Sequence, residues 1–162
     1  MGSFKIGFIG EFEHVLDDKS RVIVPVKWRE ALGEKIYLCR SLDGTRCVWG
    51  FSEDEFARFC DKLRRGVRMG DLAGQDQLRT LSSSVTEAEV DKQGRILISP
   101  KLRDHAMIPE SPKGTNVLMV GMMDRFEIWM PDRIRERQDG VETQTLLKKI
   151  DDVNDDTSST VG

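Results

Sequence analysis

The chain has 162 residues, of which 33% are charged and 38% are hydrophobic, and its mean hydropathy is −0.43. This length suits one ordinary domain or two very small ones, and the composition is typical of a soluble globular protein without a membrane-spanning segment. The net charge is −3, but residues 141–162 alone contribute this excess, so the rest of the chain is neutral and nucleic-acid binding is not excluded.

The first predicted unit covers residues 8–51. An alternating strand leads through a charged loop into an apolar triplet, and Pro25 then starts a helix of about two turns that ends at Gly33. A hairpin with its turn at Asp43-Gly44 completes the unit. The predicted strands are residues 12–16, 22–24, 35–40 and 46–49.

A helical linker is predicted at residues 52–83. Ser52 and Glu55 form a capping box, and the apolar residues that follow recur at helical spacing up to Leu63. A weaker apolar pattern predicts a second helix around residues 71–81. The first of these helices is therefore expected to bury one face.

The second predicted unit covers residues 84–138. Ser99 is placed to cap a helix that has Pro100 at its first position, and Pro131 opens a short polar helix rich in arginine. The predicted strands are residues 85–90, 96–98, 116–121 and 126–129. Beyond this unit the apolar content falls, and we expect residues 139–162 to be an acidic, disordered tail.

The two units repeat one another. The stretch DDKSRVIVPVKWRE at residues 17–30 aligns with DKQGRILISPKLRD at residues 91–104, which places Asp17 on Asp91 and Arg21 on Arg95. We predict a mainly β protein with α elements (α+β), built as a tandem duplication that forms one compact module.

The repeated stretch lacks the groups that catalysis or metal binding requires. Each aspartate has an arginine four positions later that keeps it ionised, and no Ser, Cys or His recurs at matching positions to act as nucleophile or base. Cys39, Cys47 and Cys60 fit neither a disulfide framework nor a zinc site. We expect no enzyme, no metal, no cofactor and no small-molecule substrate.

Basic side chains recur in the loop and at the helix start of both units, and this pattern favours a DNA-binding surface. Arginine can contact phosphates or read guanine in the major groove, so Arg21 and Arg95 are the first candidates. Asp17 and Asp91 would hold the loops by accepting bonds from backbone amides and from the arginines. The predicted DNA-binding residues are Arg21, Arg95, Lys19, Lys92, Arg29 and Arg103.

A purely structural interpretation explains the same loops. An exposed Asp–Arg pair in a solvated turn stabilises a protein by only about 0–1 kcal/mol, and duplication copies turns as readily as binding sites. The recurrence by itself therefore leaves both interpretations open.

The linked motifs HVLDDKSRVIVPVKWRE, EVDKQGRILISPKLRD and RFEIW resemble the MraZ family of bacterial transcriptional regulators over about residues 8–138. The resemblance implies two AbrB-like swapped-hairpin units, a ring-shaped homo-oligomer and binding to short direct repeats of double-stranded promoter DNA. It also implies repression of the division and cell-wall gene cluster, in the cytoplasm and at the nucleoid. The alternative is an AbrB-like antidote or regulator that acts mainly through another protein.

The family's DNA-contacting motif falls on both loops of this chain, with two departures. Ser20 stands where glycine is usual, which would strain or reshape the first loop if that position has a positive φ. Gln93 replaces the lysine of the first loop, while Gly94 keeps the usual glycine. We therefore expect the second loop to contribute less affinity for phosphate, although Lys92 can compensate in part.

Overall fold

The structure is a computed structural model that describes residues 6–158. The first unit comprises β1 (Glu11–Leu16), β2 (Arg21–Ile23), α1 (Val26–Leu32), β3 (Lys35–Arg40) and β4 (Val48–Ser52). The linker forms α2 (Glu53–Gly66) and α3 (Leu72–Ser84). The second unit comprises β5 (Thr86–Glu89), β6 (Arg95–Leu97), α4 (Pro100–His105), β7 (Thr115–Gly121), β8 (Phe126–Trp129) and α5 (Pro131–Gln138), and α6 (Leu146–Ser158) follows it.

The two units exchange strands rather than forming separate sheets. In the six-stranded antiparallel sheet, ordered β1-β7-β8-β4-β3-β5, the first strand of each unit pairs with the third strand of the other. The short strands β2 and β6 pair with each other in a separate two-stranded ribbon. The predicted α+β class with two tandem units is confirmed, and both sheets contain strands from both repeats.

One face of the large sheet packs against α1, α4 and the ribbon. Trp28 of α1 stacks on Phe126 and meets Phe8 and Phe12 edge-on, and all of these belong to one buried cluster or pack against it. The residues that alternate inward on the ribbon, Val22 and Ile96, join the same cluster. The ribbon is therefore fixed to the body of the protein through its inner face.

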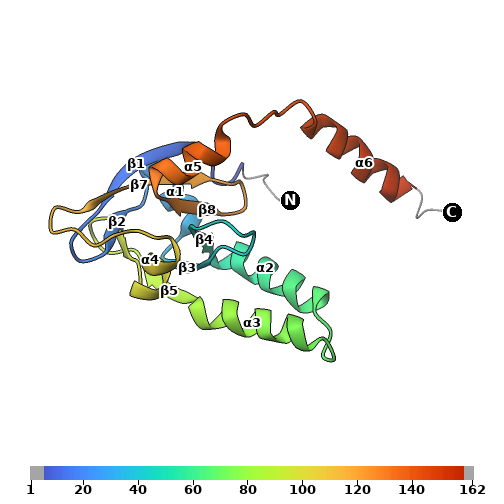
Figure 1. Ribbon diagram of the computed structural model, residues 1–162, viewed down its shortest axis with the longest axis horizontal. Helices are drawn as coiled ribbons and strands as arrows, with labels where there is room; N and C mark the ends of the chain where they lie inside the picture. Colours follow the sequence, from blue (N-terminus) through green and yellow to red (C-terminus); the bar gives the residue numbers. More distant parts are fainter. Residues whose placement is uncertain (1–5, 159–162) are drawn as a thin grey trace.

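The other face of the sheet packs against the helical linker and α5. Trp49 and Phe51 of β4 contact Phe59 of α2, and Trp129 lies in the same cluster. Both tryptophans are buried, as expected for core aromatics. The helices α2 and α3 run side by side and project from the sheet as a hairpin (Figure 1).

The helix starts follow the predicted capping chemistry. The Ser52 side chain accepts a bond from the Glu55 amide at 3.3 Å, and the Ser99 side chain accepts one from the Leu102 amide at 3.3 Å. Gly33 closes α1 with a φ of 72°, a conformation that glycine adopts without strain. These local signals set the element boundaries within a few residues.

The tail differs from the prediction of disorder. Residues Leu146–Ser158 form α6, because Leu146, Ile150 and Val153 recur at helical spacing, a signal that the acidic composition outweighed in the sequence interpretation. Residues 159–162, also predicted to be disordered, lie outside the described residues. Among the helices at residues 6–158, none has both the length and the apolar character needed to cross a lipid bilayer.

Gly50 of β4 provides a test of this packing. An added Cβ would overlap the ring of Phe126, whereas a Cβ on Gly66, at the end of α2, meets nothing within 4 Å. We expect Gly50→Ala to lower the free energy of unfolding by about 1–3 kcal/mol through overpacking, and Gly66→Ala to leave it unchanged or slightly higher. Urea denaturation measures both, and equal values for the two variants would contradict the packing described.

Candidate nucleic-acid interface

The first loop is closed by the carboxylate of Asp17. Its Oδ1 accepts hydrogen bonds from the backbone amides of Lys19 and Arg21, both at 2.9 Å, and its Oδ2 accepts one from Nε of Arg21 at 2.9 Å. The Ser20 amide donates to the Asp17 carbonyl at 3.0 Å. The carboxylate thus fixes both the path of the loop and the direction in which the Arg21 side chain leaves it.

The second loop has the same geometry. Oδ1 of Asp91 accepts bonds from the amides of Gln93 and Arg95 at 2.9 and 2.8 Å, and Oδ2 accepts one from Nε of Arg95 at 2.9 Å. The Arg95 amide is the main cause that holds the pKa of Asp91 below its usual value. For Asp17, partial burial raises the pKa, but the bonds from Arg21 and Lys19 outweigh it and the pKa is again lowered. Both carboxylates stay ionised at neutral pH.

The structure corrects the role predicted for Arg103. This side chain is only 3% exposed, so it does not lie on a surface that DNA can reach. Its guanidinium donates to the carbonyls of Ile108, at 3.2 Å, and Pro109, at 2.6 Å, and its remaining terminal nitrogen bonds to Oγ of Ser20. Arg103 of the second unit therefore holds the loop of the first unit.

Arg29 has the corresponding position in the first unit. Its Nε donates to the Val24 carbonyl at 3.0 Å, and its guanidinium lies directly against Gly94 of the second loop. The backbone adds a matching pair of bonds at 2.8 Å, from the Val24 amide to the Gly94 carbonyl and from the Ile98 amide to the Ser20 carbonyl. Arg29 is half-buried and only its Nε makes a hydrogen bond among residues 6–158, so its DNA contact stays a prediction, and each loop contacts the other unit.

These contacts explain the different residues at the two turn positions. Ser20 and Gly94 both have positive φ, 61° and 78°. Gly94 takes its φ without strain and leaves room for the Arg29 guanidinium, which an added Cβ would displace. For Ser20, the left-handed conformation costs on the order of 1–2 kcal/mol, and the bond from the buried Arg103 cation contributes a similar amount, about 1.5–3 kcal/mol. The bond from Arg103 therefore offsets the backbone strain of having serine instead of glycine at this position.

The ribbon places the two loop arginines on one exposed face. In β2 and β6, Arg21 pairs with Leu97 and Ile23 pairs with Arg95, and directly paired residues point to the same side. Arg21 and Arg95 therefore lie at diagonal corners, with about 8 Å between their Cα atoms by ordinary strand geometry. Ile23 and Leu97 occupy the other two corners and are 44% and 60% exposed.

Sequence reasoning did not single out Ile23 and Leu97 as surface residues, because it predicted each apolar triplet as a strand without assigning its faces. Alternation along the triplet is the signal that could have found them: Val22 and Val24 are buried, and Ile23 between them is not. An exposed apolar pair flanked by two arginines is an unusual surface for a solvated turn. This feature favours the binding interpretation over the structural one.

The two loops differ in how much of the arginine is free. Among residues 6–158, neither terminal nitrogen of Arg21 has a hydrogen-bond partner, whereas Nη2 of Arg95 donates to Oε1 of Gln93. Lys19 and Lys92 are exposed and have no carboxylate within 4.0 Å in this part of the chain. Gln93 therefore removes a positive charge from the second loop and also occupies part of its arginine.

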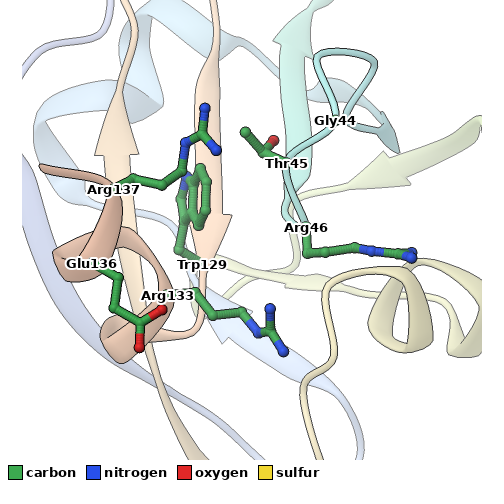
Figure 2. A pocket seen from close by; sticks show the side chains of 7 residues that line it. All are labelled: Gly44, Thr45, Arg46, Trp129, Arg133, Glu136 and Arg137. Atoms are coloured by element: carbon green, nitrogen blue, oxygen red, sulfur yellow. The ribbon is translucent and has the colours of Figure 1, made fainter.

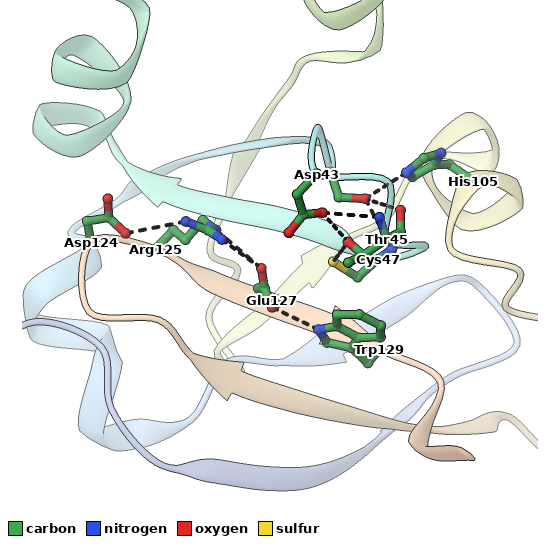
Figure 3. A network of polar contacts seen from close by, with 9 residues as sticks. Asp43, Thr45, Cys47, His105, Asp124, Arg125, Glu127 and Trp129 are labelled. Atoms are coloured by element: carbon green, nitrogen blue, oxygen red, sulfur yellow. Dashed lines mark hydrogen bonds and ion pairs between the residues drawn. The ribbon is translucent and has the colours of Figure 1, made fainter. Parts of the chain in front are cut away.

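A third arginine near the sheet has a structural role. Arg125 lies 4.0 Å over the Trp49 ring and donates to Oε2 of buried Glu127 at 3.0 Å, and Oε1 of Glu127 accepts the Trp129 indole N–H at 2.9 Å (Figure 3). Burying a carboxylate is costly unless hydrogen-bond partners such as these offset the loss of water. This network fixes the hairpin of the second unit and leaves Arg125 unavailable to DNA.

Arg103 and Lys101, both on α4, form a matched pair for testing the inter-unit clamp. Arg103→Ala removes three hydrogen bonds of a buried cation, so we expect the free energy of unfolding to fall by about 2–4 kcal/mol and hydrogen exchange at residues 18–21 to accelerate. Lys101→Ala at the exposed position should change stability by less than about 0.5 kcal/mol. If both variants behaved alike, Arg103 would not hold the first loop.

The chain was compared with known proteins. A model of the MraZ protein family, whose description likens it to antitoxins, matches residues 8–71 and 82–139. Proteins named transcriptional regulator MraZ from Caldicellulosiruptor saccharolyticus and Ligilactobacillus salivarius are 37% and 38% identical to it. These matches cover 90% and 78% of this chain, and 97% and 82% of the relatives. With both repeated units matched by the family model, the chain belongs to the MraZ family.

Proposed function

We propose that the protein is a sequence-specific DNA-binding transcriptional regulator whose contact surface is the outer face of the β2–β6 ribbon. The observation that carries this proposal is the diagonal arrangement of Arg21 and Arg95 around Ile23 and Leu97. The names of the relatives, which are those of a regulator and not of an enzyme, support the same function.

The ribbon has the dimensions and the chemistry to enter the major groove. A two-stranded β-ribbon fits this groove, arginine reads guanine through two parallel bonds, and apolar side chains contact the methyl group of thymine. The free terminal nitrogens of Arg21 can make such a pair of bonds because Asp17 engages only its Nε. Lys19 and Lys92 flank the ribbon and would contact phosphates, which position the protein without reading sequence.

Assembly is part of the proposed function. One subunit offers few phosphate contacts and a neutral body, so a single copy should bind weakly. Several copies on a common ring would raise the effective concentration of the second and later loops and favour short direct repeats of DNA. Repression of the division and cell-wall gene cluster, the target that the family resemblance implies, belongs to this proposal.

The expected difference in DNA affinity between the two loops provides a test of the proposed function. We expect Arg21→Ala to weaken binding to DNA from upstream of the protein's own gene by more than Arg95→Ala, because Arg95 already shares a nitrogen with Gln93. Loss of a paired base contact costs about 1–3 kcal/mol, and each lost phosphate contact lowers the log–log salt slope by about 0.9. Gel shifts over a range of salt concentrations measure both quantities.

Arg58→Ala is the control for this experiment, since Arg58 is an exposed arginine paired with Glu55 on α2, away from the ribbon. It should leave affinity and salt slope unchanged. If Arg21→Ala bound DNA as tightly as the wild type, that result would falsify the proposed surface. If Arg21→Ala and Arg95→Ala lost the same DNA affinity, only the predicted difference between the two loops would be wrong. A co-purifying protein partner without DNA binding would favour the antidote alternative.

A further inference from the structure

Four arginines around two adjoining hollows have no acidic partner among residues 6–158. Elsewhere in the described chain most arginines pair with carboxylates, and Arg29 and Arg103 bond to backbone carbonyls. The remaining arginines have no carboxylate oxygen of residues 6–158 within 4.0 Å. Four of these arginines lie at the end of β3, in the turn between β3 and β4, and on α5. They are Arg40, Arg46, Arg133 and Arg137. Arg64 and Arg68, near the tip of the α2–α3 hairpin, are the other two.

The hollow itself lies between this turn and α5. It has a volume of about 270 Å³, and Arg133 and Arg137 reach it from α5 beside Trp129, with Arg46 on the opposite wall (Figure 2). Glu136 is its single acidic residue, so the lining carries an excess of positive charge. A lining with three arginines and one glutamate favours an anionic occupant.

A second hollow shares Arg46 and continues the same surface. Its lining includes Arg40 and His105. Partial burial lowers the pKa of His105 below its usual value, and the charges of Arg40 and Arg46 lower it further. The only acid that lines the second hollow, Asp76, is paired with Arg79, so Arg40 and Arg46 extend the positive surface beside the first hollow.

The tail helix α6 has the complementary charge. Its aspartates form two pairs spaced by one helical turn, Asp151 with Asp155 and Asp152 with Asp156, and this spacing equals that of Arg133 and Arg137 on α5. Every α6 side chain whose exposure the structure describes is exposed, including Leu147, which precedes Asp151 by one turn on the same row. A helix of 13 residues is marginal in water without tertiary packing.

We propose that α6 of one copy docks on the arginine hollow of a second copy, with Asp151 and Asp155 opposite Arg133 and Arg137. Within one chain α6 stands apart from the sheet and from α5, which is why the occupant is the helix of another copy (Figure 1). The contact joins two different surfaces, so it continues from copy to copy and closes into a ring or extends as a chain. It rests on the assembly part of the proposed function, but it does not require DNA.

The test measures the mass of the full-length protein in the absence of DNA, by size exclusion with light scattering at several concentrations and salt levels. We expect Asp151→Arg/Asp155→Arg on the exposed helix, and Arg133→Glu/Arg137→Glu in the hollow, each to weaken self-association at least tenfold. The matched control is Arg64→Glu/Arg68→Glu, which reverses the two other unpaired arginines and should leave the mass unchanged. Circular dichroism verifies that every variant is folded.

Restoration of charge complementarity distinguishes docking from a general effect of charge. A chain carrying both double substitutions should regain the wild-type mass, and an equal mixture of the two reversed variants should do the same. The proposal is overturned if the helix variant keeps the wild-type mass, or if complementary charges restore nothing. A wild-type monomer at all concentrations also overturns it and would place the helix on its own chain.

The two proposals fail in different measurements. If the charge-reversed variants form smaller assemblies but still bind DNA through Arg21, the result supports the docking of α6. It also leaves the proposed ribbon surface standing. Normal assembly of a protein that does not bind DNA would instead remove the proposed function and keep the docking contact.

Discussion

Strand exchange between the two repeats determines the relative position of the two Asp–Arg loops. Because β2 pairs with β6, each loop ends at the strand of the other unit, and the bonds from Val24 to Gly94 and from Ile98 to Ser20 fix that junction. Arg29 and Arg103 add a side-chain clamp at each end of the ribbon. A single unit would lack the partner strand and the clamp, so the interface exists only when both repeats fold together.

The role of each arginine follows from its surroundings. Arg103 and Arg125 are largely buried and use their nitrogens within the fold, whereas Arg21 keeps two terminal nitrogens free at the surface. A buried guanidinium needs these bonds to offset the loss of water, and this requirement makes it unavailable to a ligand. The basic residues available for the proposed DNA contact are consequently fewer than the sequence indicates, and this small number is the reason for proposing that several copies act together.

The edges of the large sheet limit how copies can meet. The outer strands β1 and β5 carry exposed acidic pairs, Glu11 with Glu13 and Glu87 with Glu89. Edge-to-edge pairing of two copies would bring like charges together, a common protection against uncontrolled sheet growth. The proposed assembly would therefore use other surfaces, such as α6 and the arginine hollow, whose charges are opposite.

Much of the local structure could be predicted from the sequence. The duplication placed Asp17 and Asp91 in equivalent turns, and Ser52, Ser99 and Gly33 marked helix ends through capping chemistry that involves only neighbouring residues. The tail helix was missed although its spacing is also local, because acidic composition was given more weight than the recurrence of Ile150 and Val153.

The sequence by itself determined the repeat, most element boundaries and the candidate residues for DNA contact. Only the tertiary structure decided which of those residues do other work, because burial depends on contacts between distant positions. Ser20 and Arg103 lie 83 positions apart and are joined by the strand exchange. Ile23 and Leu97 became surface residues for the same reason: a two-stranded ribbon has one face on the core and leaves the other to solvent.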